Sequence, residues 1–333
     1  MTTSEINNTK RIVWIDNFKS FAIFLLFWGH CCGCMMSETF NLFIVAWHMP
    51  LFVFASGYMA VKLRGKIHSW GDVDAYIQKL ALHIALPNML FTCLAMAVGY
   101  GAGARWSRML ICLVGLTFFL LLGYLFYTEK IKDGRWIKYA LILVSFIFTP
   151  IWYLPFMIEV MIIFVVAQCV SYRYFHNNSW VFAFLFTAVM MVIPSPFHAT
   201  AEFVIIFLVA MLVNYRKGLI EQIYSKIKWG GTLLICAAMG VVGWFTFKDY
   251  VSLDHQFYLS WWYSLIREGD WSTFPLRQLT ILMFVPAIAA ITALCSGKYN
   301  WFSRYGSLTL AMYALNCIFV GALRKSSRPG CRL

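Results

Sequence analysis

Charged side chains are scarce in this chain, and their scarcity excludes an ordinary soluble domain. Asp, Glu, Lys and Arg together make up 12% of the 333 residues, about half the share that soluble globular domains carry. Hydrophobic residues make up 61%, and the mean hydropathy is +0.71. Apolar runs long enough to cross a ~30 Å hydrocarbon core recur from one end of the chain to the other. The composition predicts an all-α fold, a polytopic transmembrane bundle of about ten or eleven helices.

Several features typical of other classes of protein are also absent. The polar start of the chain has no positive region ahead of a small-residue cleavage site, so we expect no removed signal peptide. We find no internal repeat and no linker, which predicts a single domain over residues 1–333. The 10 cysteines are spread through apolar segments, and this distribution favours packing residues over a disulfide framework.

The apolar runs predict about eleven membrane spans. They cover residues 18–35, 40–61, 80–101, 109–127, 137–153, 155–172, 180–195, 199–215, 230–247, 277–296 and 305–323. With the N-terminus in the cytoplasm, most Lys and Arg residues fall in cytoplasmic loops, as the positive-inside rule requires. The net charge of +13 is then a property of the loops and needs no nucleic-acid partner. The basic tail, residues 324–333, breaks this pattern, so either segment 155–172 or 199–215 is re-entrant or the tail is atypical or truncated.

Two histidines, His30 and His48, interrupt two consecutive apolar segments. A histidine in hydrocarbon is costly, so it indicates a functional site by default. Counting 1.5 Å per residue from each helix end predicts nearly the same depth for the two imidazoles. The alternative is that each histidine only hydrogen-bonds across the bundle. We expect no metal site, because only His30 and Cys34 of the HCCGC run share a helix face, and structural zinc needs four ligands.

A group of polar residues is expected at the inner ends of the first three segments. Asp16 and Lys19 are three residues apart on one helix face, where they can meet an anionic ligand or form a solvated helix start. Ser56 precedes a glycine that permits either close ligand approach or ordinary tight packing. Lys79 and His83 are four residues apart and suit a phosphate-bearing ligand. Positive-inside charge with anionic lipid is the alternative for the basic residues.

Glu159 lies inside the apolar segment 155–172, so we expect it to be buried. It can pair with a histidine across the bundle and raise the basicity of that histidine. It can equally form a structural hydrogen bond, and the sequence leaves both roles open.

Many of these residues stand in recurrent patterns. A basic residue, ten intervening residues and a histidine are present as Lys19 and His30, preceded by an I-D-x-x-K element. The other motif positions are His48, Pro50, Phe52, Ser56, Gly57, Tyr58, Lys79, His83, Pro87, Trp152, Tyr153, Leu154, Gly306, Ser307, Leu308, Tyr313 and Asn316. On these residues the chain resembles the integral membrane acyltransferases of family three, which O-acetylate bacterial surface polysaccharides and related glycans. It departs from them at Lys79 and His83, where arginines are usual, and at Asn316, where a histidine is common.

The resemblance implies an acyl-CoA donor, most often acetyl-CoA, and a hydroxyl of a glycan or lipid-linked sugar as acceptor, in a bacterial inner membrane. The imidazole of His30 can act toward that hydroxyl as general base, or as an acyl-accepting nucleophile. We group His48 and Glu159 with His30 as catalytic candidates. The donor-binding candidates are Asp16, Lys19, Ser56, Lys79 and His83. Two alternatives stay open, a proton-coupled transporter or flippase of envelope precursors and an inactive family member.

Overall fold

A computed structural model describes the larger part of the chain. Its described residues are 12–32, 38–97, 113–115, 117, 120, 121, 123–125, 127, 128, 134–147, 153–192, 200–215, 222, 230, 231, 233, 234, 237, 238, 240, 241, 285, 288, 289, 301–309, 311–313, 315, 316 and 319. Of these, residues 30–32, 38–48, 95–97, 147, 191, 192, 200–203, 302 and 307 are described by their backbone only. The expected spans 109–127, 230–247, 277–296 and 305–323 lie largely outside the described residues, as does the whole tail.

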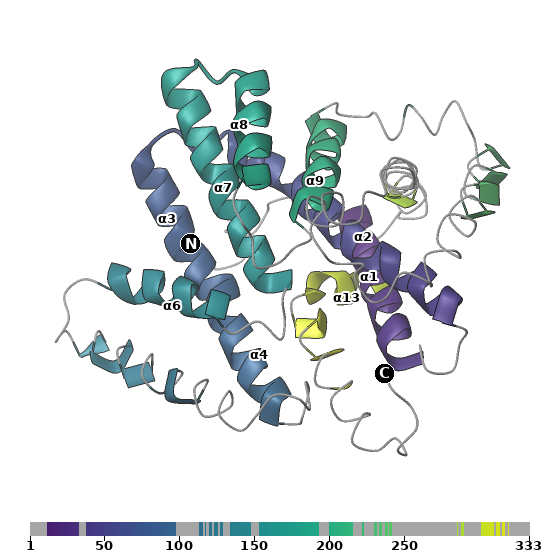
Figure 1. The fold of residues 1–333 in the computed structure, drawn as a ribbon, viewed down its shortest axis with the longest axis horizontal. Coiled ribbons are helices and arrows are strands. Elements are labelled where there is room, and N and C mark those ends of the chain that lie inside the picture. The colour runs from purple at the N-terminus through teal and green to yellow at the C-terminus, as the bar shows by residue number, and fades with distance from the viewer. Residues whose placement is uncertain are drawn as a thin grey trace, which may run out of the picture.

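Every regular element in the described part of the chain is helical. The elements are α1 (Val13–Cys32), α2 (Glu38–Arg64), α3 (Trp70–Leu80), the π-helical turn η2 (Ala81–Ala85), α4 (Leu86–Ala97), α6 (Arg135–Ile147), α7 (Tyr153–Tyr174), α8 (Ser179–Val192), α9 (Thr200–Tyr215) and α13 (Trp301–Ser307) (Figure 1). Two stretches, Trp70–Leu94 and Tyr153–Tyr174, are long and apolar enough to cross a membrane. The all-helical prediction is therefore confirmed for the described residues. The number of spans stays a prediction.

The third helix begins well before the expected span at 80–101. Ser69 caps it, because the Ser69 side chain accepts from the amide of Asp72 at 3.2 Å and the Asp72 carboxylate accepts from the amide of Ser69 at 2.8 Å. This reciprocal capping box satisfies two backbone donors that a helix start otherwise leaves open. The first turns of α3 are too polar to register in a hydropathy window, so the apolar run marked only the later part of one continuous helix.

α6 packs across this long helix near η2 (Figure 1). The Tyr139 hydroxyl donates to the Asp74 carboxylate, and Lys138 Nζ donates to Gln78 Oε1 at 2.9 Å. These polar contacts join the polar first half of the helix to the start of α6. The apolar contacts of Leu141 and its neighbours then continue along the same interface.

Helix ends that the sequence predicts on one side of the membrane meet in the structure. Trp14 near the start of α1 contacts Tyr58 near the end of α2, with ring centroids 4.7 Å apart. Arg64 Nη2 at the end of α2 donates to Ser179 Oγ at the start of α8 at 2.6 Å. Asn214 Nδ2 near the end of α9 donates to the Tyr58 carbonyl. The contacts agree with the alternating helix directions predicted for these segments, although they do not identify the side.

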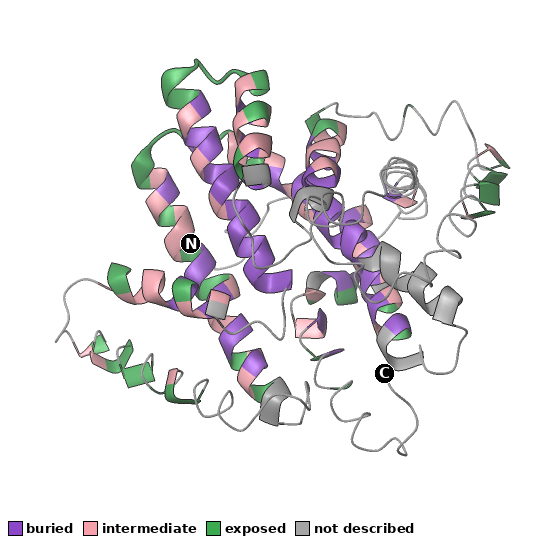
Figure 2. Ribbon diagram, in the orientation of Figure 1, coloured by how far each residue is buried: buried purple, intermediate pink, exposed green. Residues whose placement is uncertain are grey.

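α7 is the most deeply buried helix of the described part, and its buried surface extends over nearly its whole length (Figure 2). The ring of Phe164 on α7 lies 5.3 Å from Phe182 and 6.2 Å from Phe186 of α8, and 5.9 Å from Phe207 of α9. Glu159 is therefore carried on the central helix.

Candidate functional site

Three aromatic rings from distant parts of the sequence meet in the interior. Phe52 of α2 lies 5.8 Å from Tyr153 of α7 and 6.2 Å from Tyr313, and the two tyrosine rings are 5.4 Å apart. All three side chains are buried. Each ring comes from a different sequence pattern, so the fold brings together three motifs that are spread from residue 52 to residue 313. We call these residues the aromatic triad.

Ser56 is joined to this triad by hydrogen bonds. Its Oγ donates to the carbonyl of Phe52, one turn earlier in α2, at 2.9 Å. A side-chain hydrogen bond also links Ser56 with Tyr153. Ser56, which the sequence predicts to contact the donor, is therefore linked to Tyr153 of the motif Trp152, Tyr153 and Leu154.

Gly57 lets two helices approach closely. A β-carbon at Gly57 would overlap the carbonyl oxygen of Phe207 on α9 and lie 2.9 Å from the Phe207 Cα. Of the two roles that the sequence allows for this glycine, the structure has the tight packing of α2 against α9.

Asp16 lies beneath the motif near the end of the sequence that contains Gly306, Ser307 and Leu308. A β-carbon at Gly306 would overlap the Asp16 carbonyl oxygen, and Ser303 Oγ donates to Asn17 Oδ1 at 2.6 Å. The Asp16 side chain is buried, so the solvated helix start that we considered is wrong. α13 covers it, while Lys19 in the next turn is half-buried. The contact of Asp16 and Lys19 with an anionic ligand stays a prediction.

Lys79 and His83 are both exposed at the junction of α3 and η2. His83 Nδ1 lies 2.9 Å from the Lys79 carbonyl oxygen, so the ring donates to the backbone one turn before it. This contact keeps the His83 imidazole on the helix face that carries Lys79, as the four-residue spacing predicts. Neither side chain is covered, and the phosphate contact predicted for them stays a prediction.

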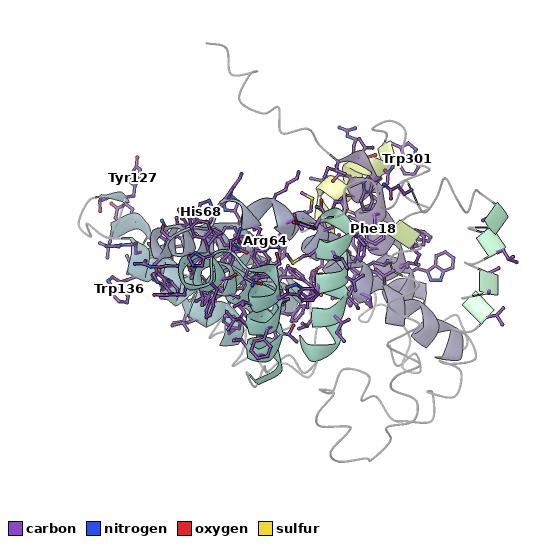
Figure 3. The ribbon with its side chains drawn as sticks, turned by 90° about the horizontal axis from the view of Figure 1, so that it is seen from above. Phe18, Arg64, His68, Tyr127, Trp136 and Trp301 are labelled. Carbon is purple, nitrogen blue, oxygen red and sulfur yellow. The ribbon has the colours of Figure 1, made fainter. Side chains whose placement is uncertain are left out.

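Further basic residues gather around the end of α2. The Arg64 guanidinium lies over the Phe182 ring at 5.4 Å, and the His68 ring contacts Tyr172 of α7 with centroids 4.3 Å apart. The labels of Arg64 and His68 lie close together in Figure 3, where the molecule is seen from above. Lys62 and Lys66 are exposed beside them. The basic residues around the end of α2 are thus described in the structure, while their place on the inner side of the membrane stays a prediction.

His30 and His48 lie in α1 and α2, and their side chains are outside the described part of the structure. The helices are antiparallel, and the Phe18 and Phe54 rings meet at 5.6 Å. Counting the same number of residues from this contact along each backbone places His48 at the same depth as Phe24. His30 then lies farther along α1 by ~9 Å of helix rise. This register differs from the equal depth that we predicted by counting from the helix ends.

Glu159 is buried on α7, with 9% of its surface exposed. The predicted burial is confirmed. The choice between pairing with a histidine and a structural hydrogen bond is not tested.

The sequence by itself assigns no role to several residues that the structure buries. Tyr153 and Tyr313 belong to motifs, yet only the fold reveals that they share one contact. Asn88 and Thr92 on α4 are fully buried. Their only signal in the sequence is a pair of polar residues, one helical turn apart, within the apolar run 80–101.

The convergence of these patterns agrees with a comparison of the whole chain with known families. Residues 12–330 match the family described as an acyltransferase domain. The chain belongs to this acyltransferase family. The resemblance drawn from the motifs is confirmed, and members of the family are membrane proteins. Neither a curated protein nor a solved structure matched the acyltransferase.

Proposed function

We propose that this acyltransferase moves an acetyl-type group from acyl-CoA to a hydroxyl of a cell-envelope glycan. We place it in the bacterial inner membrane with a cytoplasmic N-terminus. The observation that carries the proposal is the aromatic triad of Phe52, Tyr153 and Tyr313, which unites three motifs of an acyltransferase family at one buried point. His48 precedes Phe52 by one helical turn on α2, so the histidine belongs to the same region of the fold.

In the proposed reaction, the imidazole of His30 removes the proton from the acceptor hydroxyl. The hydroxyl oxygen attacks the thioester carbon, the carbon–sulfur bond breaks, and the CoA thiolate leaves and takes up a proton. General base catalysis of this kind contributes roughly 10²- to 10⁴-fold to a rate. A neutral imidazole can accept this proton, as a general base must.

The donor is expected to bind from the basic end of the molecule. Lys79 and His83 are exposed one turn apart on α3 and η2, and Lys62 and Lys66 are exposed at and after the end of α2. Charge-assisted hydrogen bonds to phosphate oxygens are roughly twice as strong as neutral ones, so such a group suits the phosphates of CoA.

The test is the acetyl content of surface glycan in cells that carry His30→Ala, at matched protein level. We expect a loss of acetylation by about 10²-fold or more, the scale of a lost general base. His176→Asn is the matched control, because His176 is an exposed histidine in the turn after α7 whose φ of 51° asparagine also tolerates. Undiminished acetylation in the His30 variant would refute the catalytic role.

Binding of acetyl-CoA separates this function from transport. The purified chain in detergent should bind acetyl-CoA and hydrolyse it slowly. A transporter of envelope precursors would do neither.

A further inference from the structure

Two polar side chains on α4 are buried without hydrogen bonds. Asn88 and Thr92 both have no exposed surface. Within the described residues, the Asn88 Nδ2 and Oδ1 atoms and the Thr92 Oγ1 atom have no hydrogen-bond partner. A buried polar group left without a partner is destabilising, and native proteins contain few of them. An amide and a hydroxyl that are one helical turn apart and lack hydrogen-bond partners among the described residues therefore indicate a ligand.

Thr92 departs from the usual behaviour of threonine in a helix. Thr117 and Thr128 donate to the carbonyls of Leu113 and Tyr124, four residues earlier, at 2.8 and 3.0 Å. This local bond is the ordinary way for a threonine hydroxyl to be satisfied within a helix. Thr92 does not make it, so its hydroxyl hydrogen is available to another group.

A buried hydroxyl on the neighbouring helix α6 is satisfied. Ser145 on α6 has no exposed surface, and its Oγ donates to the Ile142 carbonyl at 2.7 Å. Thr92 lacks a bond of this kind among the described residues.

The pair faces the interior of the protein. Asn88 and Thr92 are four residues apart, so they share one helix face at a separation of ~6 Å along the axis. Met89 beside them packs in one cluster with Leu141 of α6 and Ile158 of α7. The π-helical turn η2 directly precedes α4, and such turns occur frequently at functional sites.

We propose that Asn88 and Thr92 bind the two amides of the pantetheine arm of an acyl-CoA. This inference rests on the proposed function, in which acyl-CoA is the donor. Asn88 accepts from an amide N–H through Oδ1 and donates to a carbonyl through Nδ2, while Thr92 donates to the carbonyl of the second amide. The two amides of pantetheine are joined by two methylene groups, a spacing that corresponds to one helical turn.

The position of the pair along the helix agrees with this ligand. Asn88 lies nine residues beyond Lys79, which corresponds to ~13 Å along the axis, and Thr92 lies one turn farther. A donor whose phosphates contact Lys79 and His83 extends its arm in this direction, toward the interior of the membrane. Uncharged amides are the part of the donor that an uncharged polar pair at this depth can bind.

Removal of the pantetheine arm from the probe tests the assignment. Affinities of the purified full-length chain in detergent are measured by calorimetry for acetyl-CoA and for 3′,5′-adenosine diphosphate, which has the nucleotide but no arm. We expect Asn88→Leu to raise the Kd of acetyl-CoA by about 10-fold, the effect of a lost buried hydrogen bond. The Kd of 3′,5′-adenosine diphosphate should stay unchanged. Thr92→Val should give the same pattern with a smaller rise, and the Ser145→Ala control should change neither value.

The outcomes separate the possible failures. Unchanged acetyl-CoA affinity in both variants, or an equal loss for both ligands, overturns the assignment. If Asn88→Leu does not fold, the Thr92→Val comparison decides in the same way. A raised KM for the glycan acceptor with unchanged acetyl-CoA affinity would assign the pair to the acceptor and so overturn the donor site. A wild-type chain that does not bind acetyl-CoA refutes the proposed function itself, which is a different result.

Discussion

Gly306 and Asp16 are in backbone contact, although they are separated by most of the chain. A β-carbon at Gly306 would overlap the carbonyl oxygen of Asp16 and lie 2.8 Å from its Cα. The contact seats α13 on the first turn of α1, where Ser303 also donates to Asn17. The late motif of the chain therefore supports the helix that carries Lys19 and His30.

Gly306→Ala should destabilise the protein, because the added carbon meets backbone atoms that cannot move aside like a flexible side chain. Overpacking of this kind typically costs about 1–3 kcal/mol and can cost more. Thermal melting of the purified protein in detergent measures the loss. Gly65→Ala is the control, since a β-carbon there has no atom within 4 Å. Equal melting temperatures for the two variants would contradict the close contact.

Tyr153→Phe should separate the hydrogen bond of Tyr153 from its packing. The variant keeps the ring contacts with Phe52 and Tyr313 and loses only the bond to Ser56, which corresponds to about 1 kcal/mol. Tyr153→Ala also creates a cavity, with a cost of about 3–5 kcal/mol. Denaturation of both variants gives the two values. The prediction fails if both lose the same stability.

The aromatic triad should behave as one energetic unit. Tyr153→Ala and Tyr313→Ala remove two rings whose centroids are 5.4 Å apart. Their combined loss of stability should differ from the sum of the single losses by about 0.5–1.5 kcal/mol, the coupling of a contacting aromatic pair. A double-mutant cycle measures this coupling. Additive losses would show that the rings are independent of each other.

Ser69→Ala should loosen the start of α3 while leaving the remote core intact. The variant removes the side-chain acceptor for the Asp72 amide, and loss of such a cap costs about 1 kcal/mol of helix stability. Hydrogen exchange should accelerate in the first turn after Trp70 and stay unchanged in α7. Ser69→Asn preserves a capping oxygen and should restore the slower exchange. Uniform acceleration over the whole protein would contradict a local capping role.

Arginine at Lys79 and His83 tests whether these departures from the family pattern weaken donor binding. Arginine presents two parallel donors to a phosphate, whereas lysine acts as a single charge. We expect Lys79→Arg with His83→Arg to lower the KM for acetyl-CoA, and Lys79→Ala to raise it by about 10-fold, with both effects weaker at high salt. Steady-state kinetics on acetyl-CoA gives the values. A wild type without activity that gains none from arginine would favour the inactive family member.

Hydropathy was sufficient for much of the helical architecture. The runs 155–172, 180–195 and 199–215 correspond to α7, α8 and α9 within a few residues, because a long apolar stretch has few stable alternatives to a helix in lipid. The start of the third helix was predicted too late, since its capping box at Ser69 and its polar first turns carry no hydropathy signal.

The amino-acid sequence alone determined the class of protein, the alternating helix directions and the motifs of an acyltransferase, because these depend on local composition and spacing. Only the tertiary structure decided that Phe52, Tyr153 and Tyr313 share one contact and that Gly306 covers Asp16. It also decided that Asn88 and Thr92 are buried without a hydrogen-bond partner among the described residues. Such contacts join residues far apart in the chain, and their formation depends on the register in which whole helices pack. No pattern within a single helix specifies that register.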